Sequence, residues 1–256
     1  MSQNKFTNRL NSKLKSIKVI ILTFKLKKNS YLLIVSLLLL IINLLLIFGL
    51  ASFERVVYII FFYHVSAAWL SYFSFGVSLI GHLLYLKQKK MNWSNLGKNS
   101  IIVGVFFVAF TLITGSLWFN STSGAYNNIY WQWSDARQTT TLILLLSYIA
   151  YLVFRNFIED REKKAKLSAI LGIVFFPTVP LSYLSAIIFT SLHPLINPNP
   201  GEPGSIYWDS IKLFILLFNL IAITILFFYL IRELKELDIA KQKLQERLYT
   251  KMEEGR

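Results

Sequence analysis

The chain has 256 residues, a net charge of +14, a mean hydropathy of +0.52 and only 16% charged residues. Soluble domains carry about 25% charged residues, so this composition excludes an ordinary water-soluble globular domain. The chain has no cysteine, which excludes disulfide scaffolds, thiolate metal sites and cysteine nucleophiles.

Six stretches of the chain are long and apolar enough to cross a membrane. A bilayer core about 30 Å thick needs about 20 apolar residues in a helix, so the pattern predicts an all-α, polytopic integral membrane protein. The second stretch is too long for one span. Counting back from the basic group at 87–90 places the outer end of this span near His64, with 53–63 as an apolar extension at the outer interface. The six stretches are Tyr31–Leu50, Val56–Leu86, Ile101–Phe119, Thr139–Ile158, Leu167–Phe189 and Ile211–Ile231.

The basic residues predict the orientation of these spans. Of the 27 Lys and Arg residues, 24 lie in four segments that alternate with the spans, namely 1–30, 87–98, 155–166 and 232–256. Cytoplasmic segments are enriched in Lys and Arg, so both termini are expected in the cytoplasm, with six transmembrane helices between them. Because this charge marks one membrane face and its anionic lipid, it does not indicate a nucleic-acid partner.

The chain is expected to have three parts. Residues 1–30 form a basic cytoplasmic or interfacial segment, in which Lys13–Lys28 is predicted as an amphipathic helix rather than as part of a cleaved signal. Residues 31–231 form the six-helix membrane domain, with an external loop at 120–137. Residues 232–256 form a cytoplasmic amphipathic helix that continues the last span.

The external loop is rich in tryptophan. Trp118 precedes it, and Trp131 and Trp133 lie within it. An aromatic belt at the membrane interface is one explanation. The other is a flat apolar platform for a planar ligand, because broad aromatic faces stack on planar π systems.

The three histidines differ in their expected depth. His64 and His193 are 129 residues apart, yet both are predicted at the outer face, on either side of the tryptophan-rich loop. Imidazole is an axial ligand for haem iron, so these two could hold one porphyrin from opposite sides. His82 is expected near the cytoplasmic end of the second span, either reaching toward the interface or forming an inner haem contact.

Asp135 and Arg137 end the loop at the start of the fourth span. Either Ser134 or Asp135 can cap this helix, where an acidic group suits the helix dipole. A cation is disfavoured at a helix N-terminus, so Arg137 is expected to pair with Asp135 or to bind a carboxylate such as a haem propionate.

Four segments of the chain resemble the heme exporter protein C (CcmC) family of cytochrome c maturation. Ser134 stands where that family usually has a tryptophan directly before the aspartate. Together, in order, the four segments cover roughly residues 55–230. They are His64-Val-Ser-Ala-Ala-Trp69, Thr114-Gly-Ser-Leu-Trp118, Trp131-Gln-Trp-Ser-Asp-Ala-Arg137 with Thr140, and Val179-Pro180 through Ser191-Leu-His193-Pro194.

The resemblance implies a haem-handling protein of the inner or plasma membrane, with haem b as its cargo at the extracytoplasmic face. His64 and His193 would be the axial ligands of the haem iron. The chain would pass haem to a CcmE-type haem chaperone and associate with CcmA/CcmB-type ABC transporter subunits. Its chemistry would be ligand exchange at iron, so no enzymatic reaction is expected. The haem site would be lined by Trp118, Trp131, Trp133, Asp135 and Arg137.

Three other functions remain open from the residues. A CcsA-like cytochrome c synthase component would have further intramembrane histidines, for which His82 is a weak indication. A haem-independent permease subunit would carry polar residues along its spans, where Asn43 and Asn219 stand out. A b-type electron carrier would need histidine pairs inside the bilayer, and only His82 is expected there.

Overall fold

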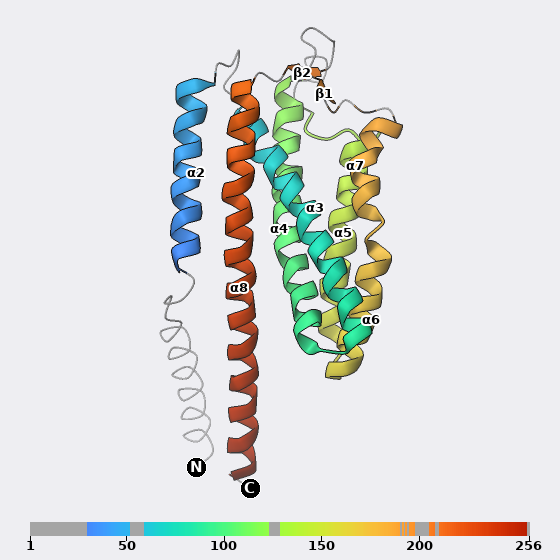
Figure 1. Ribbon diagram of the computed structural model, residues 1–256. Coiled ribbons are helices and arrows are strands. Elements are labelled where there is room, and N and C mark those ends of the chain that lie inside the picture. Colours follow the sequence, from blue (N-terminus) through green and yellow to red (C-terminus); the bar gives the residue numbers. More distant parts are fainter. Residues whose placement is uncertain are drawn as a thin grey trace, which may run out of the picture.

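The computed structural model describes residues 30–51, 59–122, 129–189, 191, 193, 195–197, 205–207 and 210–254. In this part of the chain, long helices run side by side along one axis, and two three-residue strands pair in parallel at one end (Figure 1). The helix predicted at Lys13–Lys28 lies outside the described residues. The elements are α2 (Ser30–Leu50), α3 (Ile59–Gln88), α4 (Met91–Thr122), α5 (Ala136–Phe157), α6 (Arg161–Phe175), α7 (Thr178–Ile188), β1 (Leu195–Asn197), β2 (Ser205–Tyr207) and α8 (Ser210–Glu254).

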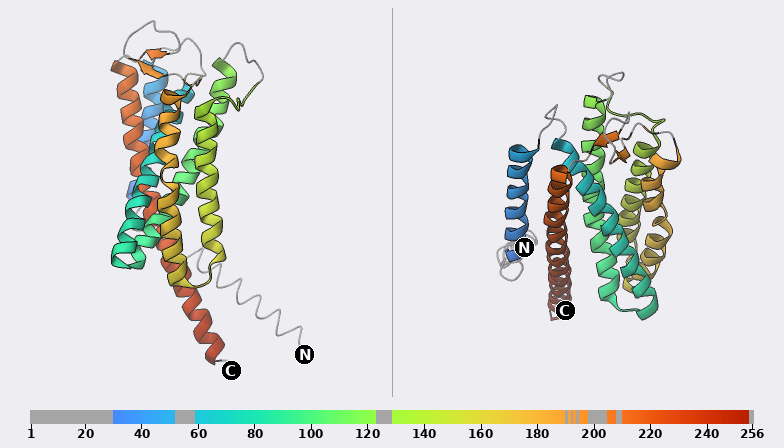
Figure 2. Two further views of the ribbon diagram at one scale, coloured as in Figure 1. Left: turned by 90° about the vertical axis from the view of Figure 1, so that its right-hand side faces the viewer. Right: turned by 45° about the horizontal axis from the view of Figure 1, so that its top comes forward.

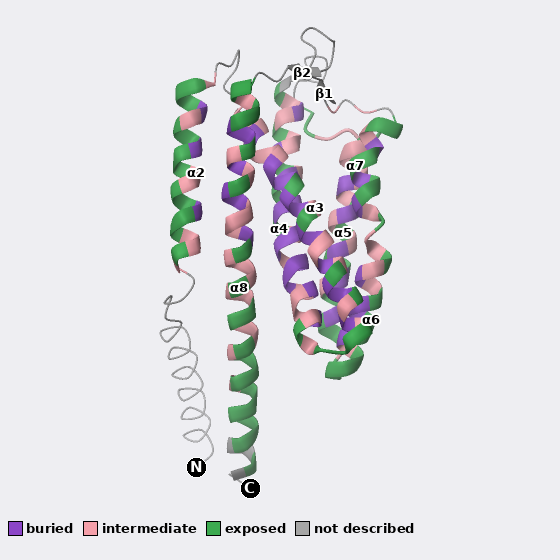
Figure 3. Ribbon diagram, in the orientation of Figure 1, coloured by how far each residue is buried: buried purple, intermediate pink, exposed green. Residues whose placement is uncertain are grey.

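The helical membrane architecture predicted from the sequence is confirmed. Among the described residues, six helices are long and apolar enough to cross a bilayer, with α6 and α7 together forming one of them. Apolar side chains cover much of the bundle's outer surface, and Figure 3 shows α2 mostly exposed. This distribution suits helices whose outer faces contact lipid rather than water.

The helix boundaries differ from the prediction at two places. Leu167–Phe189 was expected as one span, but it is divided into α6 and α7 at Phe176 and Pro177. Pro177 has no N–H to donate to the carbonyl one turn earlier, so the α-helical hydrogen bonding stops there. The Thr178 hydroxyl donates to the Phe175 carbonyl at 2.7 Å and satisfies one of the freed acceptors.

The second difference is at the predicted basic loop 87–98, most of which is helical. α4 begins at Met91, only two residues after α3 ends. Lys89 has a φ of 56°, a left-handed conformation that allows the chain to reverse within this short link. α3 and α4 therefore form a tight antiparallel pair along most of their length.

Three glycines of α4 let α3 approach closely, because each faces an aromatic ring of α3. A Cβ added at Gly97 would lie 2.6 Å from His82, and one at Gly104 would lie 2.6 Å from a carbon of Phe75. A Cβ at Gly115 would lie 3.0 Å from His64. Glycines at such contacts allow close helix packing in membranes.

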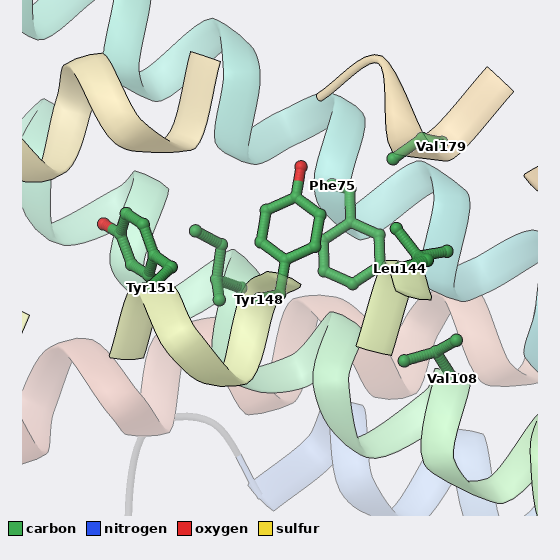
Figure 4. Packing of buried hydrophobic residues seen from close by; sticks show 7 residues of the cluster. Phe75, Val108, Leu144, Tyr148, Tyr151 and Val179 are labelled. Carbon is green, nitrogen blue, oxygen red and sulfur yellow. The ribbon is translucent and has the colours of Figure 1, made fainter. Parts of the chain in front are cut away.

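An aromatic cluster joins α3 and α4 to α5 and α7. The rings of Phe75 and Tyr148 stack 3.9 Å apart at 7° (Figure 4), and both side chains are buried. Val108, Leu144 and Val179 pack around this pair. The cluster holds the middle of α5 and the first turn of α7 against α3 and α4, which sets the positions of α5 and α7 in the bundle.

Buried asparagines tie α2 and α8 to the rest. Asn43 of α2 donates to the Ile215 carbonyl of α8 at 2.9 Å, and Asn219 of α8 donates to the Phe62 carbonyl of α3 at 3.0 Å. Asn219 also donates to the Ser66 hydroxyl at 3.1 Å. Both asparagines are fully buried, so they serve as contacts between helices.

The helix predicted to continue the last span is confirmed. α8 runs without a break from Ser210 to Glu254, and its C-terminal part extends beyond the other helices (Figure 2). Asp238, on this extension, forms an ion pair with Lys98 and accepts a hydrogen bond from Asn99 at 3.0 Å. These contacts fix the base of the extension to the start of α4.

His82 lies in the packed interior and does not reach toward the interface. Its side chain is fully buried, and its Nε2 lies 2.9 Å from the Tyr151 hydroxyl. Its Nδ1 lies 3.3 Å from the Ser78 hydroxyl, and a Cβ at Gly172 would lie 2.5 Å from its ring. Both ring nitrogens thus have protein partners, and the surroundings leave no room for a porphyrin in this structure.

The packing around His82 gives a prediction about stability. Gly172→Ala should lower the thermal stability of the purified protein, because overpacking a tight interior costs about 1–3 kcal/mol. Gly76→Ala is the matched control, since a Cβ there would meet nothing within 4 Å. The melting temperature of each variant in detergent is measured from the fraction of monodisperse protein that remains in size-exclusion chromatography after heating. Equal melting temperatures for the two variants would show that the close contact at His82 is not rigid.

Candidate functional site

The predicted site residues gather at the end of the bundle away from the C-terminal extension of α8. The N-terminal ends of α3 and α5 and the C-terminal ends of α4 and α7 meet there (Figure 1). His64 is on the second turn of α3, and Trp118 is near the end of α4. Trp131, Trp133 and Asp135 lie on the segment that leads into α5. His193 lies on the segment after α7.

The fold brings the two outer histidines together. The ring centres of His64 and His193 are 6.3 Å apart, and the ring planes are inclined by 36°. Two imidazoles on opposite sides of one metal ion have ring centres about 6 Å apart, because each bond is about 2 Å and each ring centre lies about 1 Å behind its nitrogen. The observed separation therefore fits a pair of axial ligands.

Within the described residues, these two imidazoles are the metal-binding side chains that the fold brings together here. Among the described residues, no group of three or more histidine or acidic side chains is arranged to hold a metal ion. A metal ion at this place would thus take its remaining ligands from elsewhere, as iron in a porphyrin does.

Asp135 is a buried anchor for the segment that carries His193. It is the N-cap of α5 and accepts a hydrogen bond from the Gln138 N–H at 2.9 Å, which confirms one of the two caps considered from the sequence. Its other carboxylate oxygen accepts from the Ser191 hydroxyl at 2.9 Å. The Ser191 oxygen in turn accepts from the His193 N–H at 3.1 Å. The side chain is only 4% exposed, so Asp135 positions the backbone at His193.

Arg137 faces α7. Its Nη1 donates to the Tyr183 carbonyl at 2.7 Å, and its guanidinium lies 5.6 Å from the centre of the Tyr183 ring. Both oxygens of Asp135 already accept other hydrogen bonds. A guanidinium has five N–H donors, and one anchoring bond leaves donors for a carboxylate.

The tryptophans do not form the single flat platform expected from the sequence. The rings of Trp131 and Trp133 are 5.6 Å apart and inclined by 66°, so one ring meets the other edge-on. Trp133 is 72% exposed, whereas the Nε1 of Trp131 is buried and has no hydrogen-bond acceptor in the part of the chain that the structure describes. Trp118 packs 6.3 Å from Phe61, which is one turn before His64. The tryptophan rings therefore form an uneven surface, in which Trp131 and Trp133 are not coplanar.

Sequence reasoning missed several residues that hold the site together. The His64 Nδ1 lies 3.0 Å from the Thr114 hydroxyl, and Ser191 joins Asp135 to His193. Thr140 donates to Ser185 at 2.9 Å and fixes α5 to α7 below Arg137. Thr114 and Ser191 were within the quoted family-like segments, but no spacing indicated which side chain each would meet.

Comparisons with known proteins assign the chain to a family. The family model of heme exporter protein C matches residues 15–250 of the chain. The chain belongs to the heme exporter protein C family. The six apolar helices among the described residues and the bacterial relatives together support a multi-pass membrane protein.

Individual relatives cover smaller parts of the chain. A heme exporter protein C from Bradyrhizobium diazoefficiens is 33% identical over 168 residues, which are 66% of this chain and 61% of that protein. The heme exporter protein C from Rhodobacter capsulatus is 28% identical over 180 residues, 69% of this chain and 72% of that protein. A ccmC-like mitochondrial protein of cytochrome c biosynthesis from Marchantia polymorpha is 32% identical over 125 residues, 49% of this chain and 51% of that protein. The chain thus spans about three fifths of the first relative and about half of the last.

The hydrogen bonds of Ser191 give a prediction about local order. Ser191→Ala removes the link between Asp135 and the His193 N–H, so this amide should exchange with deuterium about fivefold faster, as expected for a net loss of about 1 kcal/mol. Hydrogen exchange with mass spectrometry measures it. Ser147→Ala, which removes a hydroxyl that donates to the Ile143 carbonyl of its own helix, is the control. Unchanged exchange at residue 193 would contradict the anchoring role.

Proposed function

We propose that this chain is a haem-handling protein of cytochrome c maturation that holds haem b between His64 and His193. The separation of the two imidazole rings, 6.3 Å between centres, is the observation that carries this proposal. The family to which the chain belongs supports it, because the relatives are named as heme exporters and as a protein of cytochrome c biosynthesis. Haem is then a cargo, and the chain supplies the two axial ligands of its iron.

The surroundings of the histidines suit the rest of a haem. Haem is planar and apolar with two carboxylates at one edge. Arg137 is a donor for these carboxylates, and Trp118, Trp131 and Trp133, none of which is buried as a whole, offer apolar surface. Asp135 contributes by holding the His193 segment.

The site is proposed at the extracytoplasmic face. The alternation of basic segments along the chain supports a cytoplasmic location for both termini, that is, for the N-terminal segment 1–30 and the C-terminal helix 232–256. All the loops that carry the site then lie outside. In a bacterium this face is the periplasmic side of the inner membrane or the outside of the plasma membrane.

Transfer of haem then consists of ligand exchange at iron. The exposed Trp133 leaves part of the site open to an incoming partner, proposed as a CcmE-type haem chaperone, with CcmA/CcmB-type ABC transporter subunits as further partners. No bond to the haem carbon skeleton needs to form on this chain, which has no cysteine to form a thioether. The proposal is therefore a non-enzymatic role.

The two alternatives have less support. A permease pathway would need polar side chains that face a passage along the spans, but Asn43 and Asn219 are fully buried and their amide groups donate to neighbouring helices. A synthase of the CcsA type would use an inner histidine, but both nitrogens of His82 face hydroxyl partners inside the protein.

The axial ligands can be tested by haem content. His64→Ala and His193→Ala, purified from haem-replete membranes, should each retain at least about 10-fold less haem per folded protein, because a bis-histidine site loses one of two iron ligands. Absorption spectroscopy of the monodisperse size-exclusion peak gives the ratio. His82→Gln is the control and should retain haem at the original ratio. Haem at the original ratio in the double variant of His64 and His193 would overturn the proposal.

The tryptophans are tested separately from the iron ligands. Trp131→Ala with Trp133→Ala should lower haem retention while the bis-histidine absorption spectrum of the remaining haem is preserved, because apolar contact is lost and the ligands stay. Trp93→Ala is the control, since its indole donates to Gln88 at the opposite end of the bundle. Retention equal to that of the control would exclude the tryptophans from the haem site.

A further inference from the structure

Thr114 and Gly115 of α4 form the immediate surroundings of the His64 ring. The Thr114 hydroxyl lies 3.0 Å from Nδ1 of His64. A Cβ built at Gly115 would lie 3.0 Å from Cε1 of the same ring, 3.6 Å from Nδ1 and 4.0 Å from Nε2. Two consecutive residues of one helix therefore contact one edge of an imidazole on another helix.

The hydrogen bonds of Thr114 decide which ring nitrogen carries the proton. A threonine hydroxyl has one hydrogen to donate, and Thr114 donates it within its own helix, to the Phe110 carbonyl at 2.8 Å. The Thr111 carbonyl is at 3.2 Å from the same hydroxyl. The hydroxyl oxygen is thus an acceptor toward His64, which makes Nδ1–H the donor.

The direction of this hydrogen bond also sets the role of the other ring nitrogen. In a neutral imidazole the proton on Nδ1 leaves Nε2 with a lone pair.

We infer that Thr114 is a positioning residue that holds His64 in the Nδ1–H tautomer, and that Gly115 leaves the space the ring needs in that orientation. Nε2 is then the nitrogen that binds the iron of the cargo haem. The inference rests on the proposed function and deepens it, because it assigns the donor atom of one ligand. It also gives a reason for the Thr114-Gly115 pair in the sequence.

The hydrogen bond has an electronic consequence as well as a geometric one. A metal-bound histidine that donates its other N–H is held in one tautomer and becomes a stronger ligand, and loss of such a partner commonly lowers metal affinity about 10–100-fold. A hydroxyl that only filled space would not have this effect. The two roles can therefore be separated by keeping the volume and removing the oxygen.

The test compares three variants in the full-length protein. Thr114→Val keeps the shape and removes the acceptor, and it should weaken binding of added haemin about 10-fold or more. It should also shift the midpoint potential of the bound haem to a more positive value, because a weaker imidazole donor stabilises ferric iron less. Thr114→Ser keeps the hydroxyl, so its affinity for haemin and its midpoint potential should match those of the unaltered protein. Ser116→Ala is the control, since the Ser116 hydroxyl bonds to the Leu112 carbonyl of its own helix.

The outcomes separate this inference from the proposed function. If His64→Ala loses haem while Thr114→Val keeps the original affinity and potential, the tautomer assignment is wrong and the ligand assignment stands. If Thr114→Ser fails as badly as Thr114→Val in monodisperse protein, the hydroxyl is not the active group, and the inference is overturned. If His64→Ala itself keeps haem at the original level, the proposed function fails first.

Discussion

The close contact between α3 and α4 is the constraint on which the rest of the structure depends. Three glycines on α4 are separated by 7 and 11 residues, about two and three helical turns, so they lie on one face. Each glycine receives an aromatic ring from the antiparallel α3. A side chain at any of these positions would displace the ring that packs against it. The pairs are Gly97 with His82, Gly104 with Phe75 and Gly115 with His64.

The same helix pair gives its two histidines opposite environments. His82 is surrounded by Gly97 and Gly172, and hydroxyl groups of α3 and α5 face both of its nitrogens. His64 is one of the first residues of α3, where the neighbouring helices end, and its ring centre is 6.3 Å from that of His193. Position along one helix thus separates a histidine used in packing from one that can bind a ligand.

Sequence patterns predicted the membrane architecture well, because span length and apolar composition are local properties. The six spans, the helical tail after the last one and a cap at the start of α5 are all present. The break at Pro177 could also have been read from the residue, since proline interrupts helical hydrogen bonding wherever it occurs. The flat aromatic surface was wrong, because the angle between Trp131 and Trp133 depends on backbone conformations in an irregular segment.

The sequence by itself singled out the candidate site residues: histidines at two predicted outer ends, a tryptophan-rich segment and an acid–base pair beside it. Composition and spacing suffice for this, because the bilayer limits where each residue type can lie. Only the tertiary structure decided which groups meet, including Thr114 with His64 and Ser191 with both Asp135 and His193. Such contacts depend on helix rotation and on the path of loops, which no local pattern encodes.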